Sequence, residues 1–493
     1  MAKKSKVFKN SFLYTFSTLL IRAMSFLLMP VYTLFLTPED YGVINLISSF
    51  IGVATFIVAF SLYSAIGRFY VEYRNDHKKL KRFYGTIITF TIISSTIFSV
   101  FFILFKNIII KFIFDGIEFF PMIFLALLIL TFSSLYTIHQ NILKGMQRGK
   151  KITILNLIVF ITQASLNIIF IVYYKLGSIG MLLATFIINL GYCIYMIFDL
   201  KRYNLMEFCI DRELLKESLQ YSIPLIPHNL STNIASFISR LFIKSNGSLS
   251  SVGLYSVASQ FSGLIDVVQV SVNQAFLPWF YEKMSNRSNK NDKEIVNLSY
   301  ILVLFYSFIY LLIGLFSQEV LLVMTNENYI TAWTTIPILV SGFSVKSIYY
   351  FYVNILFYHK NLSKKIFIAS IIGSLADIIL SYVLVPLYGM YGASLSFLFA
   401  KIIIVLIVVV ISKKYDDIGY RLKYMIRIIC TSLLFMMVGL YFSYTKYIDV
   451  LSLSNIVYKL TILIIYIVFA YISNKKLIKE TIREDIFKYF KKK

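Results

Sequence analysis

Apolar runs of roughly 20 residues, the length that a helix needs to cross a bilayer, recur along almost the whole chain between short polar breaks. The runs are continuous and do not alternate as the strands of a membrane barrel must, and a helix satisfies its own backbone hydrogen bonds in lipid. The pattern predicts an all-α integral membrane protein with about 14 transmembrane helices. The predicted spans are residues 11–36, 41–64, 84–105, 120–142, 153–174, 177–199, 222–243, 251–275, 295–316, 332–357, 366–386, 389–411, 425–444 and 456–473.

The chain also matches itself at an offset of about 211 residues, which indicates an internal repeat. Six predicted spans lie in each copy, and an even number returns the chain to the same side of the membrane. Two six-helix lobes related by a pseudo-two-fold axis along the membrane normal are therefore predicted, with two extra C-terminal helices. The aligned pairs include Gly42 with Gly253, Ser48 with Ser259, Phe50 with Phe261 and Phe69 with Phe280.

This repeat divides the chain into five predicted parts. They are an N-lobe at 1–199, a cytoplasmic linker at 200–221, a C-lobe at 222–411, two appended helices at 412–473 and a tail at 474–493. The tail places isoleucines on one helical face among lysines, so we expect it to lie along the anionic inner leaflet.

The positive charges that give the chain its net charge of +24 concentrate in the polar breaks on one side of the membrane. With the N-terminus inside, alternate breaks and the two termini hold 37 of the 48 Lys and Arg residues, and the opposite breaks hold 5. This asymmetry follows the positive-inside rule and predicts a multi-pass protein with both termini cytoplasmic, with membrane lipids and no nucleic acid as partners. No Walker loop and no metal-ligand or redox spacing of cysteines is present in the sequence, so no cofactor is predicted.

Polar residues recur at intervals of three and four in several spans, which places them on single helical faces. A charged side chain at mid-membrane costs roughly 2.5–3.5 kcal/mol on insertion scales, so such residues usually face water or a partner. We therefore predict an aqueous, net positive cavity where the two lobes meet. Its candidate cations are Arg22, Arg240, Lys346 and Lys401; its candidate polar residues are Ser25, Asn233, Tyr255, Ser259, Gln269 and Asn273; its candidate ion-coupling residues are Asp266 and Asp377.

Such a cavity favours an anionic cargo such as a phosphate or pyrophosphate, which arginine binds through two parallel hydrogen bonds. Two alternatives remain open at this point: the serine and threonine stripes could serve helix packing alone, and Lys401 could pair structurally with Asp377. Arg427 and Lys459 lie close enough to the membrane surfaces to extend toward water.

A membrane-embedded polymerase or ligase is the competing class. The longest outer breaks have only about 15 residues, and we expect Glu319 and the other three acidic residues there to be solvated. His139 and His228 are expected to be ordinary interior histidines. The sequence therefore predicts a transporter and not an enzyme.

Two stretches carry a family resemblance. "MPVYTLFLTPEDYGVINLISSF" (29–50) resembles the opening motif of the Wzx-type polysaccharide and oligosaccharide-lipid flippases, and "LVPLYGMYGASLSFLFAK" (384–401) is similar to their eleventh and twelfth helices. These flippases belong to the multidrug/oligosaccharidyl-lipid/polysaccharide exporter (MOP) superfamily. The resemblance implies two six-helix lobes plus two helices, and a cationic lumen that maps onto Arg22, Arg240, Lys346 and Lys401.

The same resemblance implies a function. An undecaprenyl-pyrophosphate-linked oligosaccharide would move from the inner to the outer leaflet of the bacterial cytoplasmic membrane by alternating access, for O-antigen, capsule or exopolysaccharide synthesis. Coupling to H⁺ or Na⁺ is expected from the carboxylates Asp266 and Asp377, because a carboxylate whose neighbour changes between states changes its proton affinity. A polysaccharide polymerase and chain-length proteins would be partners. Lipid II flippases and cation-coupled multidrug antiporters share the fold and remain alternatives.

Overall fold

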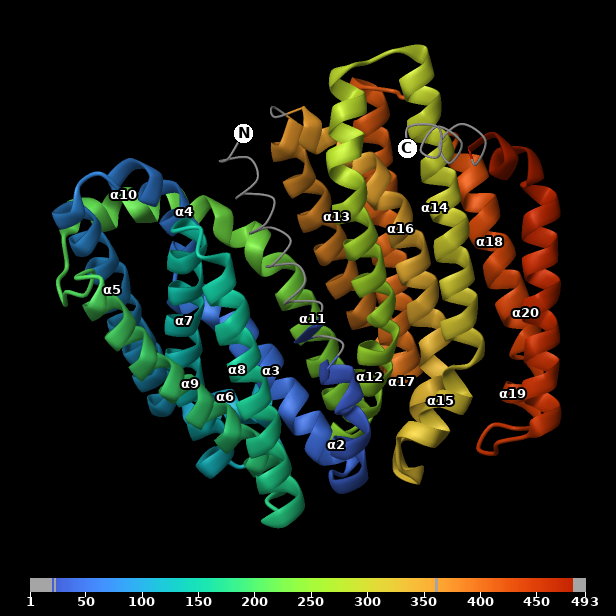
Figure 1. The fold of residues 1–493 in the computed structure, drawn as a ribbon. Helices are drawn as coiled ribbons and strands as arrows, with labels where there is room; N and C mark the ends of the chain where they lie inside the picture. Colours follow the sequence, from blue (N-terminus) through green and yellow to red (C-terminus); the bar gives the residue numbers. More distant parts are fainter. Residues whose placement is uncertain (1–19, 22–23, 360–361, 482–493) are drawn as a thin grey trace. The chain divides into compact units, whose positions relative to one another are not determined.

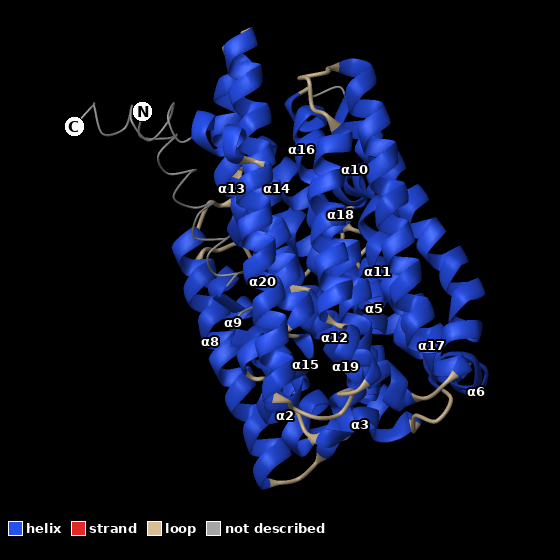
Figure 2. Ribbon diagram, turned by 90° about the vertical axis from the view of Figure 1, so that its right-hand side faces the viewer, coloured by secondary structure: helices blue, strands red, loops and turns tan. Residues whose placement is uncertain are grey.

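The computed structural model describes residues 20–21, 24–359 and 362–481 of the chain. Within these residues the secondary structure is helical, and no β-strand occurs (Figures 1 and 2). The chain divides into two compact units, Met1–Gly253 and Leu254–Lys493, which we call unit 1 and unit 2. The all-helical fold predicted from the apolar runs is confirmed.

Unit 1 is built around a central helix, α7, which packs against α3, α4, α5, α8 and α9. Its core is aromatic and aliphatic, with Phe83 and Tyr84 fully buried between α4, α5 and α7. The helices of unit 1 are α2 (Met29–Phe35), α3 (Pro38–Val58), α4 (Leu62–Tyr73), α5 (His77–Leu104), α6 (Lys106–Ile109), α7 (Phe124–Gly145), α8 (Gly149–Ile168), α9 (Gly177–Arg202), α10 (Arg212–Ser222) and α11 (Ile226–Asn246). Helix α12 (Leu249–Ser262) begins in unit 1 and ends in unit 2.

Unit 2 is built around α16, which packs against α13, α14, α17 and α18. Its helices are α13 (Leu264–Ser285), α14 (Asn289–Leu315), α15 (Ser317–Met324), α16 (Ile336–Tyr358), α17 (Ser363–Tyr415), α18 (Leu422–Gly439), α19 (Tyr441–Thr445) and α20 (Leu453–Ser473). Helices α18 and α20, the two that fall outside the internal repeat, both pack against α14.

Helix α17 is two antiparallel helices joined at Gly389, whose φ of 55° lies in the left-handed region that glycine adopts without strain. The two halves lie close together because glycines face the contact: a Cβ at Gly373 would lie 2.0 Å from Ile404, and one at Gly392 would lie 2.1 Å from the Leu384 carbonyl oxygen. The predicted spans 366–386 and 389–411 are therefore the two halves of α17.

Ten helical segments of the described part of the chain are long and apolar enough to cross a membrane, with α17 counted as one. The first predicted span is described at residues 20–21 and 24–36, where Met24–Phe35 forms a shorter apolar helix. Helices α11, α12 and α13 are present but do not reach the length and apolarity of the other spans. The corresponding predicted spans, 11–36, 222–243 and 251–275, all show a polar face in the sequence, although 153–174 and 366–386 show one as well. The total of 14 spans stays a prediction.

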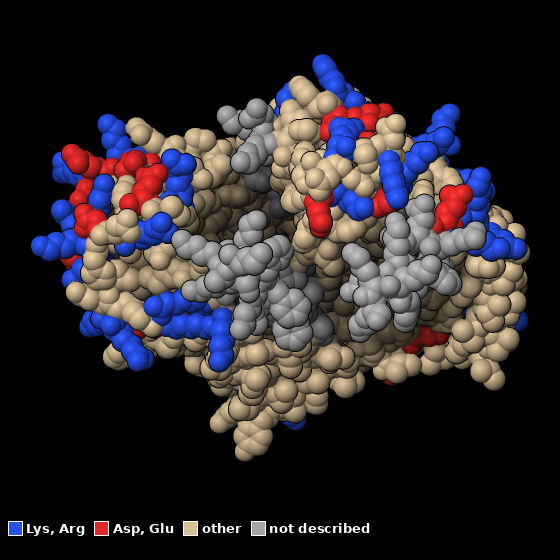
Figure 3. All heavy atoms as spheres, turned by 45° about the horizontal axis from the view of Figure 1, so that its top comes forward, with Lys and Arg blue, Asp and Glu red and all other residues tan. Residues whose placement is uncertain are grey.

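Charged residues gather at one end of each unit. Figure 3 looks toward the end that carries α10 in unit 1 and the α13–α14 turn in unit 2, and Lys and Arg side chains cluster there in both units. The positive-inside rule predicts the basic end of each unit to be cytoplasmic. The assignment of sides, and the boundaries of the five predicted parts, stay predictions.

The "TPEDYG" motif begins α3. Thr37 and Asp40 form a capping box, in which the Thr37 hydroxyl accepts a hydrogen bond from the Asp40 amide at 3.1 Å and the Asp40 carboxylate accepts from the Thr37 amide at 3.3 Å. Asp40 Oδ1 also accepts a hydrogen bond from the Ser178 amide at 3.1 Å, which ties the start of α3 to the start of α9. The motif therefore fixes where α3 begins and what it packs against.

Gly42, the last residue of that motif, makes a reciprocal contact with its repeat equivalent. A Cβ at Gly42 would lie 1.9 Å from the Leu249 carbonyl oxygen, and a Cβ at Gly253 would lie 1.9 Å from the Pro38 carbonyl oxygen. Pro38 and Gly42 are separated from Leu249 and Gly253 by the same offset of 211 residues, so equivalent atoms exchange partners. Reciprocal contacts of this kind are expected where two equivalent segments are related by a two-fold axis. The contact therefore agrees with the internal repeat found in the sequence.

We expect Gly42→Ala to destabilise the protein by about 1–3 kcal/mol, because the new methyl group would overlap backbone atoms that cannot rotate away. Gly52→Ala, on the same helix, is the matched control, because a Cβ there would meet nothing within 4 Å. The control should be neutral or stabilising by up to about 1 kcal/mol. Thermal unfolding of the purified variants measures both, and equal melting temperatures would refute the close approach.

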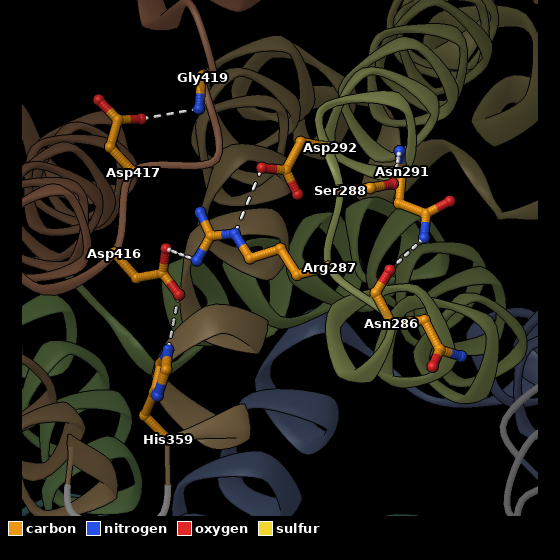
Figure 4. A network of polar contacts seen from close by, with 9 residues as sticks. All are labelled: Asn286, Arg287, Ser288, Asn291, Asp292, His359, Asp416, Asp417 and Gly419. Carbon is orange, nitrogen blue, oxygen red and sulfur yellow. Dashed lines mark hydrogen bonds and ion pairs between the residues drawn. The ribbon is translucent and has the colours of Figure 1, made fainter.

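A network of ionic side chains joins three segments at the charged end of unit 2 (Figure 4). Arg287, in the α13–α14 turn, lies 3.3 Å from Asp292 and 2.6 Å from Asp416 just after α17. His359, after α16, hydrogen-bonds the other oxygen of Asp416 at 2.6 Å. The contact with Asp416 raises the pKa of the Arg287 guanidinium, so this cation stays charged throughout the physiological range.

Replacing Asp416 by asparagine should lower the stability of unit 2 by about 1–2 kcal/mol, because Arg287 and His359 lose the carboxylate that joins them. Asp417→Asn is the matched control: this neighbour caps its own turn through the Gly419 amide at 2.9 Å and contacts neither cation (Figure 4). A larger loss of melting temperature in Asp417→Asn than in Asp416→Asn would contradict the network.

Lys459 corrects two expectations. It does not extend to the membrane surface: its side chain is 0 % exposed, and its ammonium lies 2.5 Å from the Glu319 carboxylate and 3.2 Å from the Gln318 amide oxygen. Glu319 was expected to be solvated, but its side chain is only 12 % exposed. The pair fastens α20 to α15 because a buried cation requires a partner of opposite charge.

Candidate functional site

The charged residues predicted for the C-terminal half come together in unit 2. Lys346 on α16 lies 2.6 Å from the Oδ1 atom of Asp266 on α13, and the Tyr350 hydroxyl donates a hydrogen bond to the same oxygen at 3.1 Å. Lys346 and Tyr350 are four residues apart, so one face of α16 presents both to Asp266. The Lys346 and Asp266 side chains keep 25 % and 22 % exposure, so the ion pair remains accessible.

Both halves of α17 add a charge to this pair. Lys401 lies 4.7 Å above the Phe397 ring, which packs against Phe343 on α16, and it is near enough to Lys346 and Asp266 to interact with them electrostatically. Asp377, on the first half of α17, interacts with Lys401 in the same way. We call Asp266, Lys346, Asp377 and Lys401 the charged cluster.

The charged cluster contains two cations and two carboxylates, so its formal charge is balanced. One oxygen of Asp377 is buried and has no hydrogen-bond partner among the described residues. A carboxylate that is partly unsatisfied at membrane depth is a site that a proton or a small cation would stabilise. A net positive site would need Arg22 or Arg240 as well, and that expectation stays a prediction.

Two predicted polar residues of α13, which share the helical face of Asp266, make amide contacts with neighbouring helices. Gln269 is fully buried and donates to the Tyr310 hydroxyl at 2.7 Å and to the Phe343 carbonyl at 2.9 Å. Asn273 accepts a hydrogen bond from Asn354 at 2.8 Å. Gln269 therefore holds α13 to α14 and α16, which positions Asp266 one turn away.

The remaining predicted residues lie elsewhere. Arg22 falls outside the described residues. Arg240 on α11 donates to the Ser236 carbonyl at 3.1 Å, and Asn233 on the same helix donates to the Asn229 carbonyl at 3.2 Å. Ser25 and Ser259 are half-buried, and Tyr255 is buried. The charged cluster therefore draws only on the residues predicted for unit 2.

A second polar cluster, in unit 1, was not predicted. His139 on α7 lies between the Tyr192 hydroxyl, 2.9 Å from Nδ1, and Asp199 Oδ2, 3.2 Å from Nε2; both partners are on α9. Lys151 on α8 contacts the other oxygen of Asp199. His139 is an interior histidine, as expected, but it is one member of a buried network that joins three helices. Asp199 is the only acidic residue in the run 177–202, and a single acidic residue in an apolar run could have indicated this cluster from the sequence.

Comparison with known proteins identifies the family. The model of a family described as "Polysaccharide biosynthesis protein" matches residues 7–284, more than half of the chain. The chain belongs to this family. The match covers residues 29–50, one of the two stretches that resemble the Wzx-type polysaccharide flippases, and so supports that resemblance.

Curated relatives of this family member include two proteins of Haemophilus influenzae. "Lsg locus putative protein 1" is 25% identical over 389 residues, which cover 74% of this chain and 91% of that protein. An "uncharacterized membrane protein" is 23% identical over 375 residues, with coverage of 74% and 87%. The similarity therefore extends over most of both proteins.

Solved structures confirm the fold. The lipid II flippase MurJ in an inward closed conformation aligns with a TM-score of 0.71 at 18% identity, covering 96% of this chain and all of that one. An inward-facing multidrug resistance MATE transporter of the MOP superfamily aligns with a TM-score of 0.60 at 15% identity, covering 80% and 98%. This polysaccharide biosynthesis family member is thus a multi-pass membrane protein with a flippase and transporter fold.

Proposed function

We propose that this polysaccharide biosynthesis family member translocates an undecaprenyl-pyrophosphate-linked oligosaccharide from the inner to the outer leaflet of a bacterial cytoplasmic membrane, by alternating access. The product would supply an O-antigen, capsule or exopolysaccharide, with the polymerase and chain-length proteins acting next. Family membership and the accessible Lys346–Asp266 ion pair at membrane depth support the proposal.

The proposal rests mainly on Lys346, a cation whose carboxylate partner a phosphate could replace. Its ammonium faces Asp266, and a quarter of its side chain is exposed, so a phosphate oxygen of the carrier lipid has access to it. A diphosphate offers the same oxygen chemistry as the carboxylate with more negative charge. Arg22, Arg240 and Lys401 are the other proposed phosphate contacts, and Ser25, Asn233, Tyr255, Ser259, Gln269 and Asn273 are the proposed polar contacts.

Competition for Lys346 would couple the cargo to an ion. When a phosphate takes Lys346, Asp266 loses its counter-ion, and a proton or Na⁺ compensates its charge. When the ion leaves, Asp266 recovers Lys346 and expels the phosphate. Asp377, with its buried unpaired oxygen, is the second proposed ion-coupling residue.

Deletion of the gene followed by lipid extraction tests the proposal. The expected result is build-up of a sugar-loaded polyprenyl carrier on the inner leaflet, together with loss of the surface polysaccharide. Build-up of lipid II would instead identify a lipid II flippase, and new sensitivity to lipophilic cations without build-up would identify a multidrug antiporter. Either of these results would contradict the proposed substrate.

A further inference from the structure

A groove lies between α14, α18 and α20 in unit 2, away from the charged cluster. The groove is shallow: about 20 Å³ of it has room for the centre of a water molecule, and the rest is open to the surroundings. The three helices pack against one another and lie side by side in Figure 1. The residues that line the groove are Leu304, Tyr424, Arg427, Ile428, Thr431, Tyr466, Phe469, Ala470, Ser473 and Asn474.

Arg427 is the one charged residue in this lining, and it has no counter-ion in the part of the chain that the structure describes. Helices α18 and α20 contain no Asp or Glu, so neither of the outer walls offers one. The guanidinium is exposed, and it therefore presents its hydrogen-bond donors to whatever fills the groove.

Most of the other polar groups at the walls already have hydrogen-bond partners. The Tyr466 hydroxyl contacts the Ser307 hydroxyl at 2.5 Å, and the Tyr424 hydroxyl is bonded to the side-chain oxygen of Asn474. The Thr431 hydroxyl donates to the Arg427 carbonyl at 2.7 Å. Arg427 is thus the group of the groove that still needs an acceptor.

The surroundings of the groove indicate an amphipathic ligand. Arg427 lies five residues into α18, about 8 Å from the start of the helix at 1.5 Å per residue, and a long arginine side chain at this distance can extend toward the lipid head groups. Ile426, Phe469 and Ile472 beside it are exposed, so the groove opens onto an apolar surface and not onto water. Basic residues flank it at Arg421 and Lys423 before the groove and at Lys475 and Lys476 after it.

We infer that this groove binds the phosphate head of an anionic phospholipid of the leaflet that faces the basic end of unit 2. Arg427 holds the phosphodiester, and the apolar wall formed by Leu304, Ile428 and Phe469 receives the start of an acyl chain. The lipid fills the contact between the two appended helices and α14. This site is separate from the proposed cargo site and does not depend on the transported substrate.

Native mass spectrometry of the purified full-length protein, titrated with phosphatidylglycerol, tests the inference. We expect one phosphatidylglycerol to bind wild-type protein at least tenfold more tightly than phosphatidylcholine. Arg427→Gln should weaken that binding about tenfold, the effect of losing a charge-assisted hydrogen bond, and Arg427→Lys should retain part of it. Lys423→Gln, which removes a charge from the same helix end outside the groove, is the matched control and should bind as wild type does.

Three outcomes would overturn the inference. Equal phosphatidylglycerol affinity in Arg427→Gln and wild type would remove Arg427 from the site. Equal losses in Arg427→Gln and Lys423→Gln would show attraction to the basic end without a site. Displacement of phosphatidylglycerol by equimolar inorganic phosphate would show an anion site with no need for a lipid. A second variant, Ala470→Leu, fills the groove and keeps the charge of Arg427. If Arg427→Gln does not fold, weakened phosphatidylglycerol binding by Ala470→Leu supports the inference, and unchanged binding contradicts it.

Discussion

Replacing Lys346 by glutamine should reduce export of the lipid-linked oligosaccharide by about 30-fold or more, while the protein still reaches the membrane. Removing one partner of a hydrogen-bonded charge pair costs about 2–5 kcal/mol, and the partial exposure of this pair favours the lower end. A cost of about 2 kcal/mol corresponds to about 30-fold in affinity for an anionic head group. Surface polysaccharide in a complemented deletion strain is the measurement.

The double variant Asp266→Asn/Lys346→Gln separates binding from folding. It removes both charges, so no unpaired carboxylate is left, and the melting temperature should return close to that of wild type. Export should remain lost, because the cation that exchanges a carboxylate for the phosphate is gone. Recovery of export in the double variant would show that the pair only holds α13 to α16, and would remove it from the transport mechanism.

Replacing Lys459 by methionine should lower the stability of unit 2 by about 3–5 kcal/mol, the range measured when one partner of a buried ion pair is removed. The Glu319 carboxylate would be left 12 % exposed without its cation, and α20 would lose its polar contact with α15. Thermal unfolding of the detergent-purified protein, followed by tryptophan fluorescence, reports the change, since Trp333 packs on Tyr444 in this region.

Lys446→Met is the control for that variant, because Lys446 is exposed and contacts the Tyr447 ring only from outside. It should change the melting temperature little. The double variant Lys459→Met/Glu319→Gln should recover most of the lost stability, because two neutral side chains cost less to bury than one unpaired charge. A destabilisation of Lys459→Met no larger than that of Lys446→Met would contradict the buried pair.

The helical fold was predictable because lipid permits few backbone arrangements. Apolar runs placed most spans close to the observed helices, including the two halves of α17. Two of the spans with predicted polar faces, 222–243 and 251–275, do not reach the length and apolarity of the other spans, whereas 366–386, which contains Asp377, does. The polar faces could be predicted because the spacing of residues along one helix depends only on the sequence of that span.

The candidate site was predictable only in part, because its contacts join distant segments. Spacing along α13 singled out Asp266, but nothing local shows that Lys346 lies opposite it 80 residues later. The same limit explains the errors at Lys459 and Glu319, which are 140 residues apart and were each judged alone as surface groups. Asp199 was overlooked because it was counted as the end of a span.

The central claim is that the purified protein moves a lipid-linked oligosaccharide between leaflets with the help of Lys346. Proteoliposomes loaded with the sugar-bearing polyprenyl diphosphate, and treated with a membrane-impermeant glycosidase, test it most directly. Wild-type protein should make the inner-leaflet lipid accessible to the enzyme, and Lys346→Gln should leave it protected as in protein-free vesicles. Equal protection with wild-type protein and without protein, in the presence of a proton or Na⁺ gradient, would contradict the account.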